Sequence, residues 1–415
     1  MTKVIGIIAE YNPFHNGHLW HLQKTLEQAG ETAPYTVAVM SGSFVQRGEA
    51  AIFAKWARAL MAVRGGIDLV LELPFVFAVR SAAYFAAGGV RLLEKLGVVS
   101  QLSFGAETAD LALLSSAAAK LDCPDTLRLF RQKMKQGKTY AAALTEAAAD
   151  AFLSAEFLAA PNNILAIEYL RALEKYAPSI LPLAIKRTGA GHNATQITGA
   201  IASASAIRKE IWGRRDLAKI LPAIPAANAA DILALLNKGA VSDAKNLDNI
   251  ILAKLRQKTW DALEKLPEVS EGLHYKIAQA ALSAANAAEL TARIKSKRYP
   301  TTRLQRIIAH VLLDTAKGDL EFFDTAGPLY ARVLAFNARG KHLLKEMKHT
   351  AKIPIITKTA AYLTSKERRA ASLPPLQAML AFDTLATDVH ALSMAGAELR
   401  TGGLDFVTSP WYLKN

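Results

Sequence analysis

Short apolar runs alternate with helical stretches along the first half of the chain. Each run is nearly continuous in apolar residues, as in strands that are buried on both faces of a sheet. The runs that we predict to be strands are residues 4–9, 35–40, 68–73, 101–104 and 180–185. The predicted helices between them include residues 17–29, 55–64 and 81–96. Strands separated by helices require right-handed crossovers, so the pattern predicts a doubly wound α/β fold with a parallel sheet.

From residue 109 onward the pattern is mainly helical. The proline-containing stretch 221–225 suggests a domain boundary, and the Ala- and Leu-rich sequence beyond it is helical to about residue 320. Two later stretches, residues 353–356 and 409–411, are less regular. The expected domains are therefore an α/β domain in residues 1–215 and a basic, mainly α-helical region in residues 216–415.

The composition is that of a folded protein without membrane-spanning segments. Of the 415 residues, 51% are hydrophobic and 21% are charged, and no apolar run approaches the ~20 residues that cross a bilayer. The first apolar run is interrupted by Glu10, Asn12 and His15, so we do not expect a secretory signal. The single cysteine, Cys123, excludes an internal disulfide and a cysteine zinc cluster. These features predict a cytoplasmic protein that does not bind a membrane.

The formal charge of +14 has two interpretations. It can serve solubility alone, or it can attract a polyanion, because Lys and Arg beside phosphates release condensed counterions. Charge alone does not decide between the two, so nucleic acid remains one candidate partner.

The most specific local pattern is His15-Asn16-Gly17-His18, which opens a predicted helix directly after the first predicted strand. Open α/β sheets bind ligands beyond the carboxyl ends of their strands. There a helix N-terminus supplies unpaired N–H groups, Gly17 removes a side chain, and the two imidazoles can donate hydrogen bonds to phosphate oxygens. Two histidines at this spacing can instead be structural or bind a metal. We interpret the pattern as a nucleotide site.

A second candidate segment is Ser203-Ala-Ser205-Ala-Ile-Arg208, at the start of a helix that follows the fifth predicted strand. Ser203 or Ser205 can cap that helix. Alternatively, Ser205 and Arg208 close on the β and γ phosphates of a nucleotide held by the histidine segment. One serine can also serve both purposes.

Together with these two segments, an ordered series of further motifs resembles the bacterial tRNA(Met) cytidine acetate ligases, which have a nucleotidyltransferase-like fold with a His-x-Gly-His motif. The motifs are Gly6-Ile-Ile-Ala-Glu10-Tyr-Asn-Pro-Phe-His-Asn-Gly-His18, Val39-Met-Ser-Gly42, Gln46-Arg-Gly-Glu49, Lys55-Trp-Ala-Arg58, Asp68-Leu-Val-Leu-Glu72-Leu-Pro74, Phe104-Gly105-Ala-Glu107 and Pro161-Asn-Asn-Ile-Leu165. The resemblance covers the N-terminal half well and continues more weakly through residues 297–303.

The resemblance implies a two-step reaction. Such enzymes use ATP, with Mg²⁺ expected as its counterion, to convert acetate to acetyl-adenylate. They then acetylate N4 of the wobble cytidine of elongator tRNA(Met). By the same resemblance, the catalytic residues are His15, His18, Ser205 and Arg208. The implied ATP site consists of Ile7, Ile8, Ala9, Glu10, Tyr11, Asn12, Pro13, Phe14, His15, Asn16, Gly17, His18, Leu19, Trp20, Gly105, Arg187 and one of the two asparagines Asn162 and Asn163.

Taken one by one, the later members of this set have ordinary structural explanations as well. Gly105 can be a turn glycine, and Asn162 or Asn163 can be part of the turn that a Pro-Asn pair favours. Arg187 can be a solvated arginine. The sequence also departs from the family pattern, since Trp20 stands where tyrosine is expected and Ala206 where threonine is expected. If that hydroxyl matters, Ser205 has to supply it.

Two basic stretches lie in the second half. Residues 291–306 contain no acidic residue, and residues 336–369 contain nine Lys or Arg against two Glu. Such runs are often solvated helix faces, but their one-sided charge favours contact with phosphates, and Tyr299 or Phe336 could stack on an exposed base. The basic residues of the first stretch are Arg293, Lys295, Lys297, Arg298, Arg303 and Arg306.

Two other functions fit parts of this pattern. The first is a small-molecule adenylyltransferase that uses the same histidine chemistry, although such an enzyme does not need a large basic second half. The second is a tRNA-binding protein whose nucleotide site is regulatory or decayed. The joint presence of His15, Gly17, His18, Arg187 and Arg208 argues against decay.

Overall fold

The computed structural model describes residues 3–30, 33–136, 138, 140–148, 154–188, 196–197, 199–213 and 216–414. The described residues form an eight-stranded sheet in the order β5-β4-β1-β2-β3-β6-β7, with β8 paired to β6. The strands are β1 (Val4–Ala9), β2 (Tyr35–Ser41), β3 (Leu69–Leu73), β4 (Gln101–Ala106), β5 (Leu181–Lys186), β6 (Ala331–Phe336), β7 (Ile355–Ile356) and β8 (Trp411–Tyr412). β1 to β5 are mutually parallel, which confirms the predicted doubly wound α/β fold.

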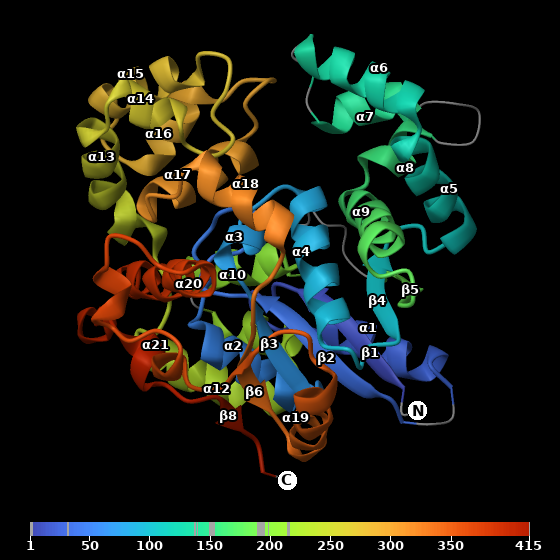
Figure 1. The fold of residues 1–415 in the computed structure, drawn as a ribbon. Helices are drawn as coiled ribbons and strands as arrows, with labels where there is room; N and C mark the ends of the chain where they lie inside the picture. Colours follow the sequence, from blue (N-terminus) through green and yellow to red (C-terminus); the bar gives the residue numbers. More distant parts are fainter. Residues whose placement is uncertain are drawn as a thin grey trace.

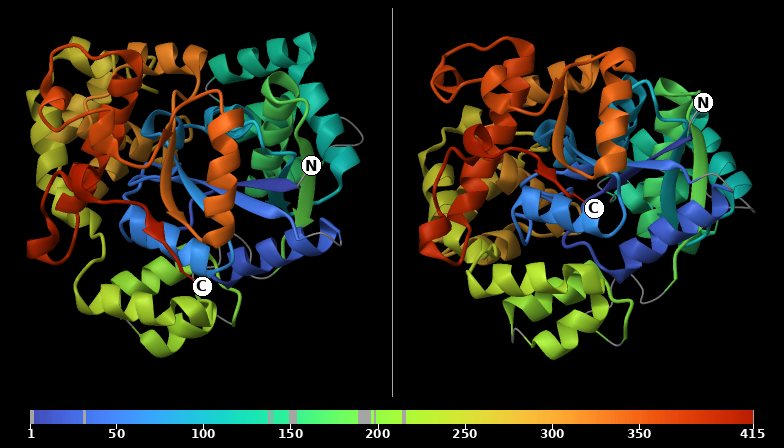
Figure 2. Two further views of the ribbon diagram at one scale, coloured as in Figure 1. Left: turned by 60° about the horizontal axis from the view of Figure 1, so that its bottom comes forward. Right: turned by 90° about the horizontal axis from the view of Figure 1, so that it is seen from below.

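Helices cover both faces of this sheet (Figures 1 and 2). Those of the first half are α1 (Asn16–Gln28), α2 (Lys55–Arg64), α3 (Phe75–Ala78), α4 (Ala82–Lys95), α5 (Leu111–Asp122), α6 (Pro124–Lys135), α7 (Tyr140–Ala148), α8 (Ala155–Ala159), α9 (Pro161–Tyr176) and α10 (Ala204–Trp212). Those of the second half are α11 (Leu217–Ile220), α12 (Ala226–Asn237), α13 (Asp248–Gln257), α14 (Trp260–Glu264), α15 (Leu273–Ser283), α16 (Ala287–Ile294), α17 (Thr301–Leu312), α18 (Lys317–Ala326), α19 (Ala338–Thr350), α20 (Pro375–Leu392) and α21 (Leu404–Val407).

Each face of the sheet has its own apolar core. Successive strand residues point to opposite faces, so Val37 and Val39 of β2 pack with α4, α9 and α19, whereas Ala38 and Met40 pack with α1, α2 and α10. Burial on both faces is the reason why the strands are nearly continuous in apolar residues.

The last third of the chain completes the sheet, which the sequence pattern does not predict. β6 pairs with β3 in the antiparallel direction, and β7 and β8, which fall in the two less regular stretches, pair with β6. The sheet is therefore mixed, and it extends past the expected boundary at residue 216. β6 is a short apolar strand between helices, and its pairing depends on contacts with residues far away in the sequence.

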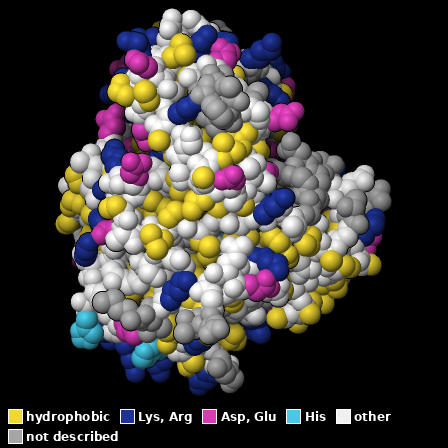
Figure 3. All heavy atoms as spheres, turned by 90° about the vertical axis from the view of Figure 1, so that its right-hand side faces the viewer, with side chains coloured by type: hydrophobic (Ala, Val, Ile, Leu, Met, Phe, Trp, Pro, Cys, Tyr) yellow, Lys and Arg dark blue, Asp and Glu magenta, His cyan; other side chains and the backbone are white. Residues whose placement is uncertain are grey.

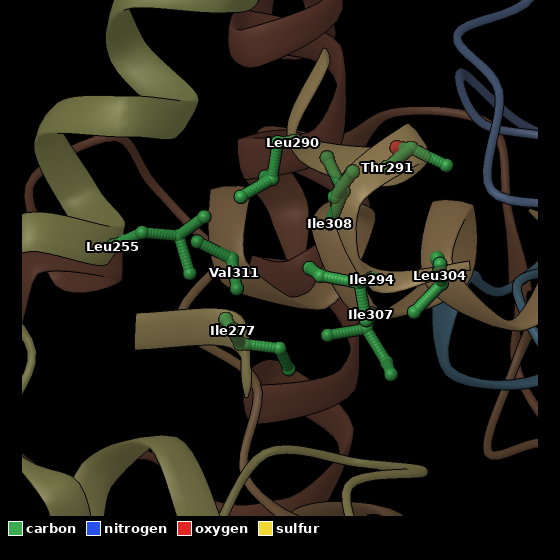
Figure 4. Close-up of a pocket in the computed structure, with 9 residues that line it drawn as sticks. All are labelled: Leu255, Ile277, Leu290, Thr291, Ile294, Leu304, Ile307, Ile308 and Val311. Atoms are coloured by element: carbon green, nitrogen blue, oxygen red, sulfur yellow. The ribbon is translucent and has the colours of Figure 1, made fainter. Parts of the chain in front are cut away.

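The second half is otherwise mainly helical, as expected. Helices α13 and α15 to α18 lie on the other side of the molecule from α5 to α9 (Figure 1), and their apolar residues continue the core of one sheet face. A void of about 10 Å³ lies between α13, α15, α16 and α17, with Leu255, Ile277 and Ile307 in its wall (Figure 4). It is apolar and too small for a ligand. None of the described helices is long and apolar enough to cross a membrane.

A buried ion cluster joins the two halves. It consists of Lys55 on α2, Glu72 on β3, Arg332 on β6 and Asp405 on α21, each at most 4% exposed. Lys55 Nζ lies 2.8 Å from both Glu72 Oε1 and Asp405 Oδ1, and Arg332 pairs with the same two carboxylates. Two cations thus face two anions, and Glu72 lies opposite Arg332 in the β3–β6 register.

Candidate functional site

A cavity of about 290 Å³ opens at the carboxyl ends of β1 and β4, where open α/β sheets bind ligands. Its walls come from the start of α1, the loop after β2, the starts of α4 and α9, the end of β5 and the start of α10. Of the predicted residues, the cavity is lined by Ile7, Ile8, Ala9, Glu10, Tyr11, His15, Gly17, His18, Trp20, Gly105, Asn162, Arg187, Ser205 and Arg208. The fold therefore brings the two motifs together.

His15 and His18 form the N-terminal cap of α1. The backbone N–H of Gly17 donates to His15 Nδ1 at 3.0 Å, and the backbone N–H of His15 donates to His18 Nδ1 at 3.3 Å. A neutral imidazole that accepts at Nδ1 carries its proton at Nε2. Both rings, whose centroids are 3.8 Å apart, therefore keep an Nε2–H donor for a ligand.

Gly17 is required by this cap. A Cβ at position 17 would lie 2.8 Å from Cε1 of His15, so any other residue would displace the ring. We expected Gly17 to make room for phosphate. In the structure, the absence of a side chain at Gly17 also leaves space for the His15 ring.

The histidines of the cavity are uncharged near neutral pH. Burial lowers the pKa of His15 to about 3, with further contributions from Arg187 and Arg208. Burial and the neighbouring His15 hold the pKa of His18 well below its ordinary value. Burial and Arg187 lower the pKa of His21 to about 4. The positive charge of the site therefore comes from its arginines, while the imidazoles contribute directed N–H donors.

The start of α10 separates the roles of the two serines. Ser203 caps the helix, because its Oγ accepts from the backbone N–H of Ala206 at 3.0 Å. Ser205 is exposed, lines the cavity and is not the cap. Arg208 donates from Nη1 to the carbonyl of Asn12 at 2.9 Å and from Nη2 to Glu49 Oε2 at 3.2 Å. Its buried Nε–H has no hydrogen-bond partner, so this donor remains available.

The loop after β2 supports both Glu10 and Arg208. Glu10 Oε1 accepts from the backbone N–H of Gln46 at 2.9 Å. Burial raises the pKa of Glu10, and Arg208 opposes that shift. Gln46, Arg47 and Glu49 all line the cavity. The sequence shows this loop only as one of the family motifs.

The other side of the cavity is organised by Glu107 at the end of β4. Its Oε1 accepts from Asn162 Nδ2 at 2.6 Å, and its Oε2 accepts from the backbone N–H of Asn163 at 2.9 Å. Asn163 is 1% exposed. Its Oδ1 accepts from the backbone N–H of Thr108, and its Nδ2 donates to the carbonyl of Phe157. Asn162, rather than Asn163, therefore faces the cavity.

Gly105 lies beside Arg187. A Cβ at position 105 would lie 3.2 Å from Cγ of Arg187, so the glycine gives room to that side chain. Arg187 itself is exposed at the cavity wall. Residues 189–195 and 198 of the polar loop that follows lie outside the described residues.

The remaining predicted residues are near the cavity but do not line it, namely Asn12, Pro13, Phe14, Asn16, Leu19 and Asn163. Asn12 Oδ1 accepts from the backbone N–H of Ile52 at 2.7 Å, and Phe14 is fully buried in the core. Asn16 Nδ2 donates to the carbonyls of Ala200 and Pro222, each at 2.9 Å. These side chains hold the loop that carries the histidines.

Several lining residues are absent from the predicted set. His21 is one of them, although it follows His18 by one helical turn and its position on the same face of α1 was readable from the sequence. Its Nε2 lies 3.2 Å from Ser103 Oγ. The loop after β2 adds Gln46, Arg47 and Glu49, which the sequence shows only as part of a family motif. Ala82, Phe85, Leu165 and Tyr169 lie in ordinary helical sequence, where no local signal marks them.

The first basic stretch is largely engaged in structural contacts. Arg306 Nε pairs with Glu268 at 2.6 Å, and Arg303 donates to the carbonyl of Glu268. Tyr299 is 3% exposed, so the expectation that it stacks on a base is wrong. Lys295 and Lys297 are exposed. On the face shown in Figure 3, Lys and Arg side chains are interspersed with Asp and Glu.

Comparisons with known proteins agree with this geometry. A sequence model of the HIGH nucleotidyl transferase family matches residues 2–402. The chain is 38% identical over 416 residues to a tRNA(Met) cytidine acetate ligase of Syntrophomonas wolfei, covering 98% of this chain and 99% of that protein. It is 41% identical over 413 residues to a protein of the same name from Thermoanaerobacter, covering 97% and 98%.

A solved structure has the same fold along its whole length. The apo crystal structure of TmcAL from Thermotoga maritima superposes with a TM-score of 0.91 at 32% identity and covers 100% of both chains. A second form of that protein, bound with alpha-thio ATP, gives a TM-score of 0.90 at 31% identity and the same coverage.

Proposed function

The chain belongs to the HIGH nucleotidyl transferase family and, within it, to the tRNA(Met) cytidine acetate ligases, and we propose that it uses ATP and acetate to form N4-acetylcytidine at the wobble position of elongator tRNA(Met). It is an ATP-dependent ligase. We place both chemical steps in the cavity at the ends of β1 and β4.

In the first step, a carboxylate oxygen of acetate attacks the α phosphorus of ATP. The new O–P bond gives acetyl-adenylate, and the bond to the β phosphate breaks to release pyrophosphate. Negative charge builds on the phosphate oxygens during this displacement, so preorganised donors at the site stabilise the transition state. We assign this role to the Nε2–H groups of His15 and His18 and to Arg208, with Ser205 beside them.

In the second step, N4 of the wobble cytidine attacks the acetyl carbon, the bond from that carbon to the phosphate oxygen breaks, AMP leaves and N4 releases one proton to solvent. The wobble base of an anticodon loop is already unpaired, so its exposure to the cavity costs little. Mg²⁺ would accompany ATP as a counterion. Among the described residues no group of three His, Cys, Asp or Glu is placed to hold a metal, so the triphosphate would supply most of its ligands.

A single observation supports this assignment most strongly. Two neutral imidazoles that share one helix cap both keep Nε2–H donors, and they line the same cavity as Arg208 from the start of another helix. This arrangement suits an anion better than a metal ion, because a metal ligand must present an unprotonated nitrogen. It also makes decay of the nucleotide site an unattractive explanation.

We assign tRNA recognition to the second half of the chain, residues 216–415. The loop after β2 offers a physical link from there to the cavity. Gly48 has a φ of +85°, and a Cβ at that position would lie 2.5 Å from the backbone of Gln305 on α17. Glu49, which holds Arg208, also accepts from Gln305 Nε2 at 3.4 Å. A displacement of α17 on tRNA binding would therefore move Glu49 and, through it, the side chain of Arg208.

The full reaction tests the proposal. Purified protein is incubated with ATP, Mg²⁺, labelled acetate and a tRNA(Met) transcript, and the tRNA is digested and examined for N4-acetylcytidine by mass spectrometry. The modified base should depend on all four components and should be absent from a transcript with uridine at the wobble position. Label transfer to a phosphorylated metabolite instead of tRNA would favour a small-molecule adenylyltransferase.

A further inference from the structure

The corner of the cavity between α4 and α9 is lined mainly by apolar side chains, unlike the part that faces the histidines. Ala82 and Phe85 lie one turn apart on α4, and Leu165 and Tyr169 lie one turn apart on α9, so each helix presents one face to the cavity. The two helices pack against each other. Phe104 of β4 closes the corner, with its ring centroid 5.7 Å from that of Tyr169. These walls are apolar except for one hydroxyl.

That hydroxyl belongs to Tyr169, and the protein leaves it without a partner. The side chain is 2% exposed, and its oxygen is buried with no hydrogen-bond partner. Burial raises the pKa of Tyr169, and the nearby charge of Glu10 raises it further, so the hydroxyl keeps its proton. A buried donor without an acceptor destabilises the protein, which is understandable if a ligand supplies the acceptor.

The chemistry of the corner limits what that ligand can be. A triphosphate needs several donors and cations, whereas this corner has one donor and apolar walls. A ligand with a compact acceptor group and a short apolar end fits both features. Among the substrates of the proposed reaction, acetate is the one that has a carboxylate joined directly to a methyl group.

We infer that the corner between α4 and α9 is the acetate site, in which the Tyr169 hydroxyl donates to the carboxylate while Phe85 and Leu165 enclose the methyl group. This inference rests on the proposed ligase function and goes beyond it by assigning the residues that select the acid. Tyr169 contacts the substrate, and the two apolar side chains set the length of acid that is accepted.

The charges around the corner are compatible with an anion. Glu10 is the acidic group that acts on Tyr169, and an ionised carboxylate there would oppose acetate. However, Arg208 and Arg47 act on Glu10 in the opposite sense. Over the described lining of the cavity, three arginines (Arg47, Arg187 and Arg208) exceed two glutamates (Glu10 and Glu49), so the site attracts anions.

The first test removes only the hydroxyl. Acetate-dependent exchange of pyrophosphate into ATP is measured for the wild type, for Tyr169→Phe and for the control Tyr84→Phe, which changes an exposed tyrosine on α4. Loss of one hydrogen bond to a charged substrate should raise the KM for acetate about 10- to 100-fold. The KM for ATP should stay within about twofold, and the control should match the wild type.

The second test changes the apolar wall and does not depend on the tyrosine variant. Leu165→Ala should enlarge the corner by several methylene volumes, so kcat/KM for propionate relative to acetate should rise on the order of tenfold. Thermal unfolding of each variant checks that the fold is kept.

Each outcome decides a separate point. A raised KM for ATP in Tyr169→Phe would place the nucleotide in this corner and overturn the inference, as would unchanged constants in a folded variant. Unchanged acid preference in Leu165→Ala would contradict the assignment of the wall. Absence of acetate-dependent exchange in the wild type would instead overturn the proposed function itself.

Discussion

The cavity and the buried ion cluster both concentrate charged side chains at the sheet, but they use them differently. In the cavity, Arg208 is held by a carbonyl and by Glu49, and it keeps a buried Nε–H donor without a partner. In the ion cluster, each charge has an opposite charge within about 3 Å. The cavity therefore keeps a donor for a ligand, whereas the charges of the cluster are balanced within the protein, where Arg332 Nη1 and Asp405 Oδ2 are the atoms without a hydrogen bond.

Their positions in the sheet explain the difference. The cavity lies where parallel strands end side by side, so loops and helix N-termini converge there and leave room for a ligand. The ion cluster lies where β6 joins β3 in the antiparallel direction and where α21 covers the junction. Its ion pairs connect the first half of the chain to the second. Substitutions in the cluster should therefore affect stability, and substitutions in the cavity should affect catalysis.

The largest expected effect is on the cluster. Glu72→Ala would leave Asp405 as the carboxylate that pairs with both Lys55 and Arg332, and loss of one partner of a buried ion pair costs about 3–5 kcal/mol. Urea denaturation should show this decrease in the free energy of unfolding. Glu27→Ala, which breaks the exposed pair with Lys24, is the control and should cost less than about 1 kcal/mol. Equal decreases in the free energy of unfolding for the two variants would show that the cluster contributes no more to stability than an exposed ion pair.

The matching substitution in the cavity is His18→Ala. It removes one Nε2–H donor, so the rate of acetyl-adenylate formation should fall about 100- to 1000-fold, as for other donors to a developing charge. The free energy of unfolding should fall by only about 1 kcal/mol, because the variant loses one cap hydrogen bond. His342→Ala, an exposed histidine on α19, should keep the wild-type rate. A His18→Ala enzyme of near-normal rate would exclude that ring from catalysis.

A pH experiment examines the edge of the cluster. Burial and the neighbouring Glu72 raise the pKa of Asp383 to about 7, and this carboxyl lies against the Tyr330 hydroxyl and accepts from the backbone N–H of Phe75. Because the pKa in the folded state lies above the unfolded value of about 4, the unfolded chain releases its proton first as the pH rises. This carboxyl therefore lowers stability between about pH 4 and pH 7.

Asp383→Asn, which mimics the protonated carboxyl, provides the comparison. The wild type should lose unfolding free energy relative to this variant, by a few kcal/mol at most, as the pH rises from about 4 to about 7, and the difference should be constant above that range. Thermal or urea unfolding of both proteins across the range measures it. Parallel stability profiles would show that Asp383 is ionised throughout.

The smallest expected effects are on tRNA binding. Lys295→Ala and Lys297→Ala remove exposed cations, so each should weaken tRNA(Met) binding a few-fold. The slope of log affinity against log salt should become shallower by about one for each phosphate that is no longer neutralised. ATP binding should be unchanged. Arg306→Ala is a poor probe of the same surface, because its ion pair with Glu268 makes it part of the helical core. Unchanged tRNA affinity in both lysine variants would place the docking surface elsewhere.

The contrast between the two regions also explains what the sequence could predict. The parallel strands were predicted because each is a contiguous apolar run, and the histidine segment at the start of a helix because His15, Gly17 and His18 lie within one turn. That the two imidazoles cap this helix was not predicted. Glu72 and Arg332, by contrast, meet only through the β3–β6 pairing, which no local pattern encodes. Tyr169 was missed for a similar reason, since a tyrosine in an apolar helix resembles ordinary core until α4 and α9 are packed together.

Two residues that were expected to contact a ligand contact other parts of the protein instead. Asn162 and Asn163 were alternatives for the nucleotide site, and the side-chain amide of Asn163 is already hydrogen-bonded to the backbone of Thr108 and Phe157. Tyr299 was expected at the RNA surface, but it is buried under the helices around it. In both cases the residue type suited the chemistry, and the neighbours that engage it come from other parts of the chain.

The cavity should activate acetate by itself, before tRNA takes part. Exchange of labelled pyrophosphate into ATP by the purified wild-type protein tests it most directly. We predict exchange that requires acetate, proceeds without tRNA and is lost in His18→Ala. Exchange that proceeds without acetate, or that requires a phosphorylated metabolite in its place, would contradict the account.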